Sequence, residues 1–72
     1  MDEQEFRALV RRMVKAQQYP DHAKLISALG RSFYQFRSGL SVEQGRWRRE
    51  EIEAAGYDWE RSKRARGLIK KT

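Results

Sequence analysis

The apolar residues near the start of the chain recur with the spacing of one helix face. Phe6, Leu9, Val10, Met13 and Val14 stand at relative positions i, i+3, i+4, i+7 and i+8. This spacing places all five side chains on one stripe of an α-helix. Acidic residues at the beginning of the segment and basic residues near its end suit the helix dipole. We therefore expect an amphipathic helix over residues 2–18 that buries this stripe.

A proline ends that helix, and a second helical segment follows. Pro20 cannot continue a helix, and Asp21 behind it is a typical N-cap. Gly39 is suited to close the second segment in a left-handed conformation. Gly30 interrupts the segment, and the sequence leaves open whether it divides the helix. The apolar residues of this segment again have helical spacing: Leu25, Ile26, Leu29, Phe33 and Phe36.

A capping box predicts the start of a third helix, expected over residues 42–55. The Ser41 side chain can accept a hydrogen bond from the backbone N–H of Gln44, whose side chain can reach back. The apolar residues of this segment form no single stripe, and Gly45 leaves open a kink. Basic residues flank Trp47, which we expect to anchor the core, with stacking on a base as the alternative.

The last helix is expected over residues 59–71, after a glycine turn at residues 56–58. Asp58 is its expected N-cap. With the helix before it, this segment has the outline of a helix-turn-helix, in which the second helix enters the major groove of DNA. Ile52 and Ser62 depart from the pattern of that motif. An ordinary helical hairpin is therefore a nearly equal alternative.

These segments predict an all-α fold in which residues 1–72 form one small bundle of three to four helices. The chain is too short for two domains, and it has no cysteine for a disulfide. The lack of cysteine suits a cytoplasmic location, and no apolar run is long enough to span a membrane. The predicted core is Phe6, Leu9, Val10, Met13, Val14, Leu25, Ile26, Leu29, Phe33, Phe36 and Ile52, completed by Trp47 or Trp59.

The net charge of +6 is concentrated at the end of the chain. Residues 61–72 contain six basic residues and no acidic ones, whereas the charges of residues 1–60 balance. A localised basic patch is typical of a surface that binds a polyanion. The predicted nucleic-acid-binding residues are Arg46, Arg48, Arg49, Arg61, Lys63, Arg64, Arg66, Lys70 and Lys71.

This charge distribution favours a small DNA-binding regulatory protein, with duplex DNA preferred and RNA as a variant. Basic side chains of the last helix would face the groove, since Arg suits guanine and Lys more often holds phosphate. Small modules of this kind usually dimerise, so we consider a homodimer through the Phe6 or the Phe33 face. One alternative is an interaction or inhibitor module that docks on an acidic protein. Another is a solvated basic face with no ligand.

The residues give little support for catalysis. His22 is the single histidine, which excludes a multi-histidine metal site, and the absence of cysteine excludes a thiolate site. The scattered glycines form no phosphate-binding loop. The glutamates of the third segment are spaced to pair with arginines, as Arg46–Glu50 and Arg49–Glu53. We expect no enzyme, cofactor or metal.

The positions of the remaining aromatic residues in these segments indicate whether each packs or projects outward. Trp59 begins the last helix beside the glycine turn, where a tryptophan more often packs than binds a ligand. Tyr34 and Tyr57 are expected to project outward, where a hydroxyl could reach a phosphate.

Overall fold

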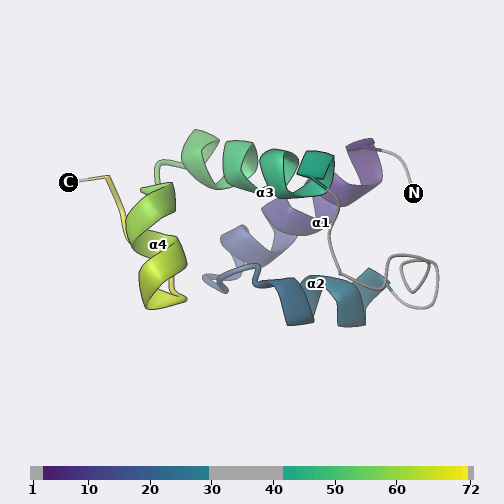
Figure 1. Cartoon of the computed structure of the whole chain (residues 1–72), viewed down its shortest axis with the longest axis horizontal. Helices are drawn as coiled ribbons and strands as arrows, with labels where there is room; N and C mark the ends of the chain where they lie inside the picture. The colour runs from purple at the N-terminus through teal and green to yellow at the C-terminus, as the bar shows by residue number, and fades with distance from the viewer. Residues whose placement is uncertain (1–2, 30–41, 72) are drawn as a thin grey trace.

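The computed structural model describes residues 3–29 and 42–71, which contain four helices (Figure 1). They are α1 (Glu3–Lys15), α2 (His22–Leu29), α3 (Val42–Ala54) and α4 (Trp59–Ala65). Within these residues no strand is formed, and the one β-type contact is an isolated bridge between Tyr57 and Lys70. The predicted all-α fold is confirmed.

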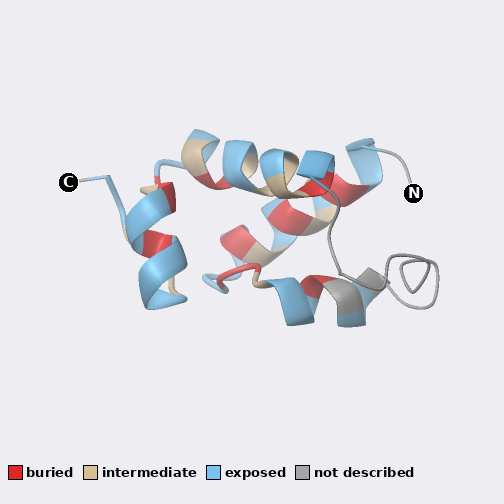
Figure 2. Ribbon diagram, viewed as in Figure 1, coloured by how far each residue is buried: buried red, intermediate tan, exposed pale blue. Residues whose placement is uncertain are grey.

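Helix α1 packs against α3, and this contact forms the centre of the core (Figures 1 and 2). Phe6, Val10 and Val14 of α1 are buried, as their helical spacing predicted. Ile52 of α3 is also fully buried, and the ring of Trp47 meets that of Phe6 edge-on at 5.8 Å between centroids. Trp47 therefore serves the core, as expected. The α1 face that was considered for a homodimer is covered by α3.

The connection from α1 to α2 is a tight turn that is exposed at first and buried at Tyr19 and Pro20. Helix α1 ends at Lys15, three residues earlier than expected, and Gln17 has a positive φ of 63°. Tyr19 and Pro20 are then buried against the core. The Asp21 side chain accepts a hydrogen bond of 2.8 Å from a backbone N–H in the first turn of α2, so the predicted N-cap is confirmed.

Helix α3 runs without interruption through Gly45, so this glycine does not break the helix. The observed bounds match the predicted segment to within one residue. Several expectations fall outside the described residues: those for Gly30, Phe33, Tyr34, Phe36, Gly39 and Ser41, and those for the side chains of Ile26 and Leu29.

Helix α4 ends at Ala65, so the prediction of a helix over residues 59–71 is wrong in its second half. Asp58 is the N-cap, as expected, and its side chain accepts the Arg61 N–H at 2.9 Å. Arg66 adopts a left-handed conformation, with φ of 53°, and its N–H donates to the Ser62 carbonyl oxygen. The Gly67 N–H donates to the same oxygen at 3.2 Å. This C-cap turns the chain away from the helix axis.

Residues 66–71, here called the return segment, run back beside the turn that precedes α4. The Asp58 N–H donates to the Ile69 carbonyl oxygen at 2.7 Å, and the Lys71 N–H donates to the Gly56 carbonyl oxygen at 3.0 Å. Tyr57 is buried, with 8% of its surface exposed, so the expectation that it projects outward is wrong. The buried apolar residues are Phe6, Val10, Val14, Tyr19, Leu25, Ile52, Tyr57 and Trp59, with Leu9, Met13, Trp47 and Leu68 packed against them.

Candidate functional site

Two arginines of α1, Arg7 and Arg11, are neutralised by carboxylates of α3. The Arg7 guanidinium bonds to Glu3, Glu50 and Glu51, and the Arg11 Nε lies 2.6 Å from a Glu51 oxygen. The hydrogen bond from Arg11 is the largest of the effects that lower the pKa of the Glu51 carboxyl, and the bond from Arg7 adds to it. Hydrogen bonds to Glu50 and Glu51 raise the pKa of Arg7. These ion pairs hold α1 and α3 together, and they leave Arg7 and Arg11 little uncompensated charge with which to bind a ligand.

Two further arginines of α3 form the predicted pairs along their own helix. Arg46 Nε lies 3.9 Å from a Glu50 oxygen, and Arg49 Nε lies 3.4 Å from a Glu53 oxygen. All four side chains are largely exposed, and pairs of this kind contribute only about 0.3–0.5 kcal/mol. Both arginines were predicted to bind nucleic acid, but each already has a carboxylate beside it.

The other predicted site residues form no ion pair within the described residues. We call this set the basic surface: Arg48, Arg61, Lys63, Arg64, Arg66, Lys70 and Lys71. Trp59 and Ser62 turn one side of α4 toward the core, so Arg61 and Arg64 lie on its outer side. Lys71 in the return segment donates from Nζ to a backbone carbonyl of α3 at 3.2 Å. The set therefore spans the middle of α3, all of α4 and the return segment.

Two cations of the basic surface lie against the buried indole of Trp59. The Arg48 guanidinium carbon is 5.1 Å from the ring centroid, and the Lys63 ammonium nitrogen is 6.0 Å from it. Trp59 is only 9% exposed, so it packs, as predicted. Arg48 is further held by a 3.3 Å hydrogen bond from Nη1 to the Pro20 carbonyl oxygen. Its Nε is buried and has no hydrogen-bond partner among the described residues.

These contacts form one wall of an open pocket of about 430 Å³. The lining comes from the α1–α2 turn, α2, α3 and the end of α4: Tyr19, Asp21, His22, Ala23, Arg48, Lys63 and Arg66. Burial raises the pKa of the Tyr19 phenol, although the positive charges of Arg48 and Arg66 oppose this shift. The sequence indicated the cations but not the pocket, because no local spacing connects Tyr19 with them.

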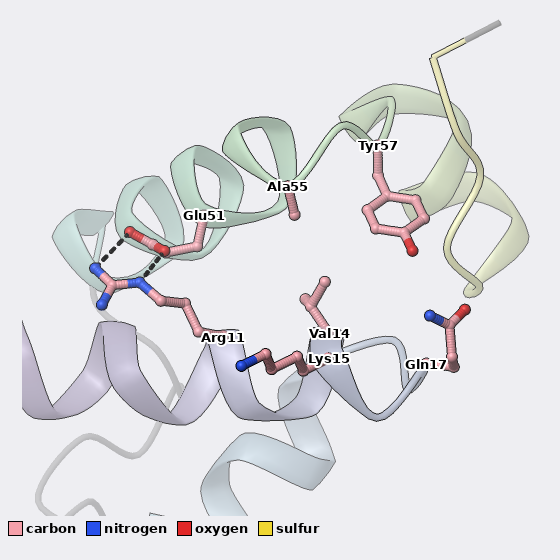
Figure 3. A pocket seen from close by; sticks show the side chains of 7 residues that line it. All are labelled: Arg11, Val14, Lys15, Gln17, Glu51, Ala55 and Tyr57. Atoms are coloured by element: carbon pink, nitrogen blue, oxygen red, sulfur yellow. Dashed lines mark hydrogen bonds and ion pairs between the residues drawn. The ribbon is translucent and has the colours of Figure 1, made fainter.

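A second pocket, of about 410 Å³, lies on the other side of the core between α1 and α3 (Figure 3). Arg11, Lys15 and Glu51 are its charged lining residues, and Arg11 and Glu51 bind each other. The first pocket has three cations against a single carboxylate, Asp21. Only the first pocket therefore presents a strong excess of positive charge.

Other kinds of site find no support in the described part of the chain. No group of three His, Asp or Glu residues within residues 3–29 and 42–71 is placed to hold a metal ion. None of the four helices has the length and apolar character needed to cross a bilayer. No protein-family model, curated protein or solved structure matches the chain. The basic surface and its pocket are thus the features that can indicate a function.

Proposed function

We propose that the chain is a nucleic-acid-binding module that contacts phosphates through the basic surface. The observation that carries this proposal is the separation of paired from unpaired cations. Arg7 and Arg11 of α1 and Arg46 and Arg49 of α3 have carboxylate partners, whereas all six cations of residues 61–71 lack one within the described residues. A surface of uncompensated cations attracts phosphates and displaces their counterions.

The form of α4 supports contact with duplex DNA in a regulatory role. Arg61 and Arg64 project from the outer side of a helix that follows α3 through a short turn. A helix presented in this way can enter the major groove, where arginine reads guanine, as in a helix-turn-helix. Lys70 and Lys71 in the return segment would hold the adjacent backbone.

The burial of the aromatic residues supports a duplex over a single strand. Proteins that bind single strands stack bases on exposed aromatic rings. Tyr19, Tyr57 and Trp59 are buried, and Trp47 packs edge-on against Phe6. Tyr19, Tyr57 and Trp59 each have less than a tenth of their surface exposed, and Phe6 covers part of the Trp47 ring. An acidic protein could also be attracted to the basic surface, and the test below separates this alternative.

The test is a titration of a short duplex and of the matching single strand, followed by fluorescence anisotropy at two salt concentrations. The first variant carries Arg61→Gln and Arg64→Gln. The matched control carries Arg46→Gln and Arg49→Gln, which change the net charge equally but remove paired arginines. We expect the duplex to bind more tightly, with an affinity that falls steeply with salt.

The two variants should differ in their salt dependence. Each arginine removed from the interface also removes a positive charge that displaces counterions, so the slope of log affinity against log salt is expected to fall by up to about two in the first variant. The control should stay near the wild-type slope. Absence of duplex binding at low salt would overturn the proposal, and an acidic protein partner would then be favoured. Equal losses in both variants would contradict the placement of the interface on α4.

A further inference from the structure

We infer that the pocket formed by Arg48, Lys63 and Arg66 holds one phosphate group of the bound nucleic acid. This inference rests on the proposed function and adds to it a defined contact point. Below, this site is called the phosphate pocket. Its lining residues are those given above, from the α1–α2 turn, α2, α3 and α4.

The first argument is that cations from separate parts of the chain converge there. Arg48 comes from α3, Lys63 from α4, and Arg66 from the left-handed C-cap of α4. Arg66 faces the same pocket as Lys63, which stands three residues before it and therefore lies near it around the helix axis.

The second argument is that Arg48 is held in place without a counterion. Its guanidinium lies over the Trp59 ring and donates to the Pro20 carbonyl oxygen, but no carboxylate within residues 3–29 and 42–71 pairs with it. Its side chain is only partly exposed, and removing a cation from water without a counterion is costly. An anion in the pocket would reduce this cost. A planar guanidinium is also well matched to the oxygens of a phosphate.

The other polar lining residues are compatible with a phosphate. Burial raises the pKa of Tyr19, so its phenol is protonated at neutral pH and can donate a hydrogen bond. Asp21 contributes the one negative charge of the lining, and its Oδ1 is already engaged as the N-cap of α2. His22 and Ala23 line the pocket next to Asp21.

The same geometry argues against a base as the occupant. Arg48 and Lys63 lie against the Trp59 ring, which is buried, so no indole face is open for stacking. A bound phosphate requires only positive charge and hydrogen-bond donors, and the lining residues of the pocket supply both. We therefore expect the contact to be independent of base sequence and to position the duplex rather than to read it.

The test compares two double variants that remove equal charge from α4 and its C-cap. The pocket variant carries Lys63→Gln and Arg66→Gln, and the outer variant carries Arg61→Gln and Arg64→Gln. All four side chains are exposed, so both variants should fold, which circular dichroism checks. Arg48 is left unchanged because it also supports the core. The same short duplex is titrated into each protein, and we expect the pocket variant to lose at least threefold more affinity.

A second readout locates the phosphate directly. Inorganic phosphate is titrated into isotope-labelled protein, and the Arg48 Nε–H and Trp59 indole N–H resonances are followed by NMR. Shifts in the wild type that are absent from the pocket variant support the inference. Duplex binding with equal losses in both variants and no phosphate response overturns it but leaves the proposed function standing. Absence of duplex binding by the wild type at low salt overturns both.

Discussion

The hydroxyl of Ser62 in α4 is bonded to both backbone polar groups of Ile69 in the return segment. Its oxygen accepts the Ile69 N–H at 2.9 Å, and it donates to the Ile69 carbonyl oxygen at 3.4 Å. Ser62 is fully buried, so water cannot replace these bonds. The same carbonyl oxygen also accepts the Asp58 N–H. One small polar side chain thereby keeps the last lysines beside α4.

Replacing Ser62 by alanine should loosen the return segment and destabilise the fold. The Ile69 N–H would lose its acceptor in a buried position, which costs about 1–3 kcal/mol. Urea unfolding followed by circular dichroism measures this change. Ser27→Ala on the exposed side of α2 is the control and should stay within about 0.5 kcal/mol of wild type. Equal stabilities for the two variants would show that the Ser62 hydroxyl does not hold the segment.

Two glycines should respond to alanine in opposite directions. Neither position has an atom within 4 Å of an added Cβ, so only the backbone differs. Gly45 lies inside α3, where alanine is favoured by about 0.5–1 kcal/mol. Gly56 has φ of +94°, where a side chain introduces strain of about 1–3 kcal/mol. Thermal unfolding should therefore place the midpoint of Gly45→Ala above wild type and that of Gly56→Ala below it. A loss of stability in Gly45→Ala would be inconsistent with a continuous α3.

The Glu51 carboxylate should make the stability depend on pH in the acidic range. Its pKa is lowered in the folded protein, so its stabilising effect is present above the unfolded value of about 4.3. This effect is lost as the pH falls through the lower folded value. The Glu51→Gln variant should therefore be less stable than wild type at neutral pH, and the difference should shrink below a pH of about 4.

The matched control for this prediction is Glu53→Gln, which removes an exposed pair within α3. Its loss at neutral pH should not exceed about 0.5 kcal/mol. Thermal unfolding of the three proteins across the acidic range provides the comparison. A difference between wild type and Glu51→Gln that is constant with pH would rule out ionisation of this carboxyl as the cause.

The α1–α3 core should be sensitive to a single truncation. Ile52 is fully buried, and Ile→Ala in such a position costs about 2–5 kcal/mol, a large part of the stability of a small domain. Val42 at the start of α3 is 91% exposed, so Val42→Ala should be nearly neutral. Urea unfolding curves distinguish the two. Similar curves would mean that α3 is not packed on α1 through Ile52.

Features that depend on neighbours in the sequence were predictable. The stripe of α1 follows from residue spacing, the caps at Asp21 and Asp58 follow from single residues before a helix, and the Arg46–Glu50 pair follows from one helix turn. Each involves residues no more than a few positions apart along one segment. Local propensity and periodicity are sufficient for such features.

Features that depend on distant residues were missed or misjudged. Leu68 and Ile69 have spacing that suits a continued helix, but bonds from Ser62 and Asp58 to Ile69 hold them in a return segment instead. The ion pairs of Arg7 with α3 join residues more than forty positions apart, and no sequence spacing indicates them. The pocket likewise requires the fold before Tyr19 and Arg48 become neighbours.

In the proposed contact with DNA, the seven-residue length of α4 would limit what one copy of the chain can read. At 1.5 Å per residue the helix is about 10 Å long, and this corresponds to about three base pairs at 3.4 Å each. So short a footprint cannot by itself select one site in a genome. Any sequence preference must come from a second copy on a neighbouring half-site or from the shape of the duplex that the basic surface follows.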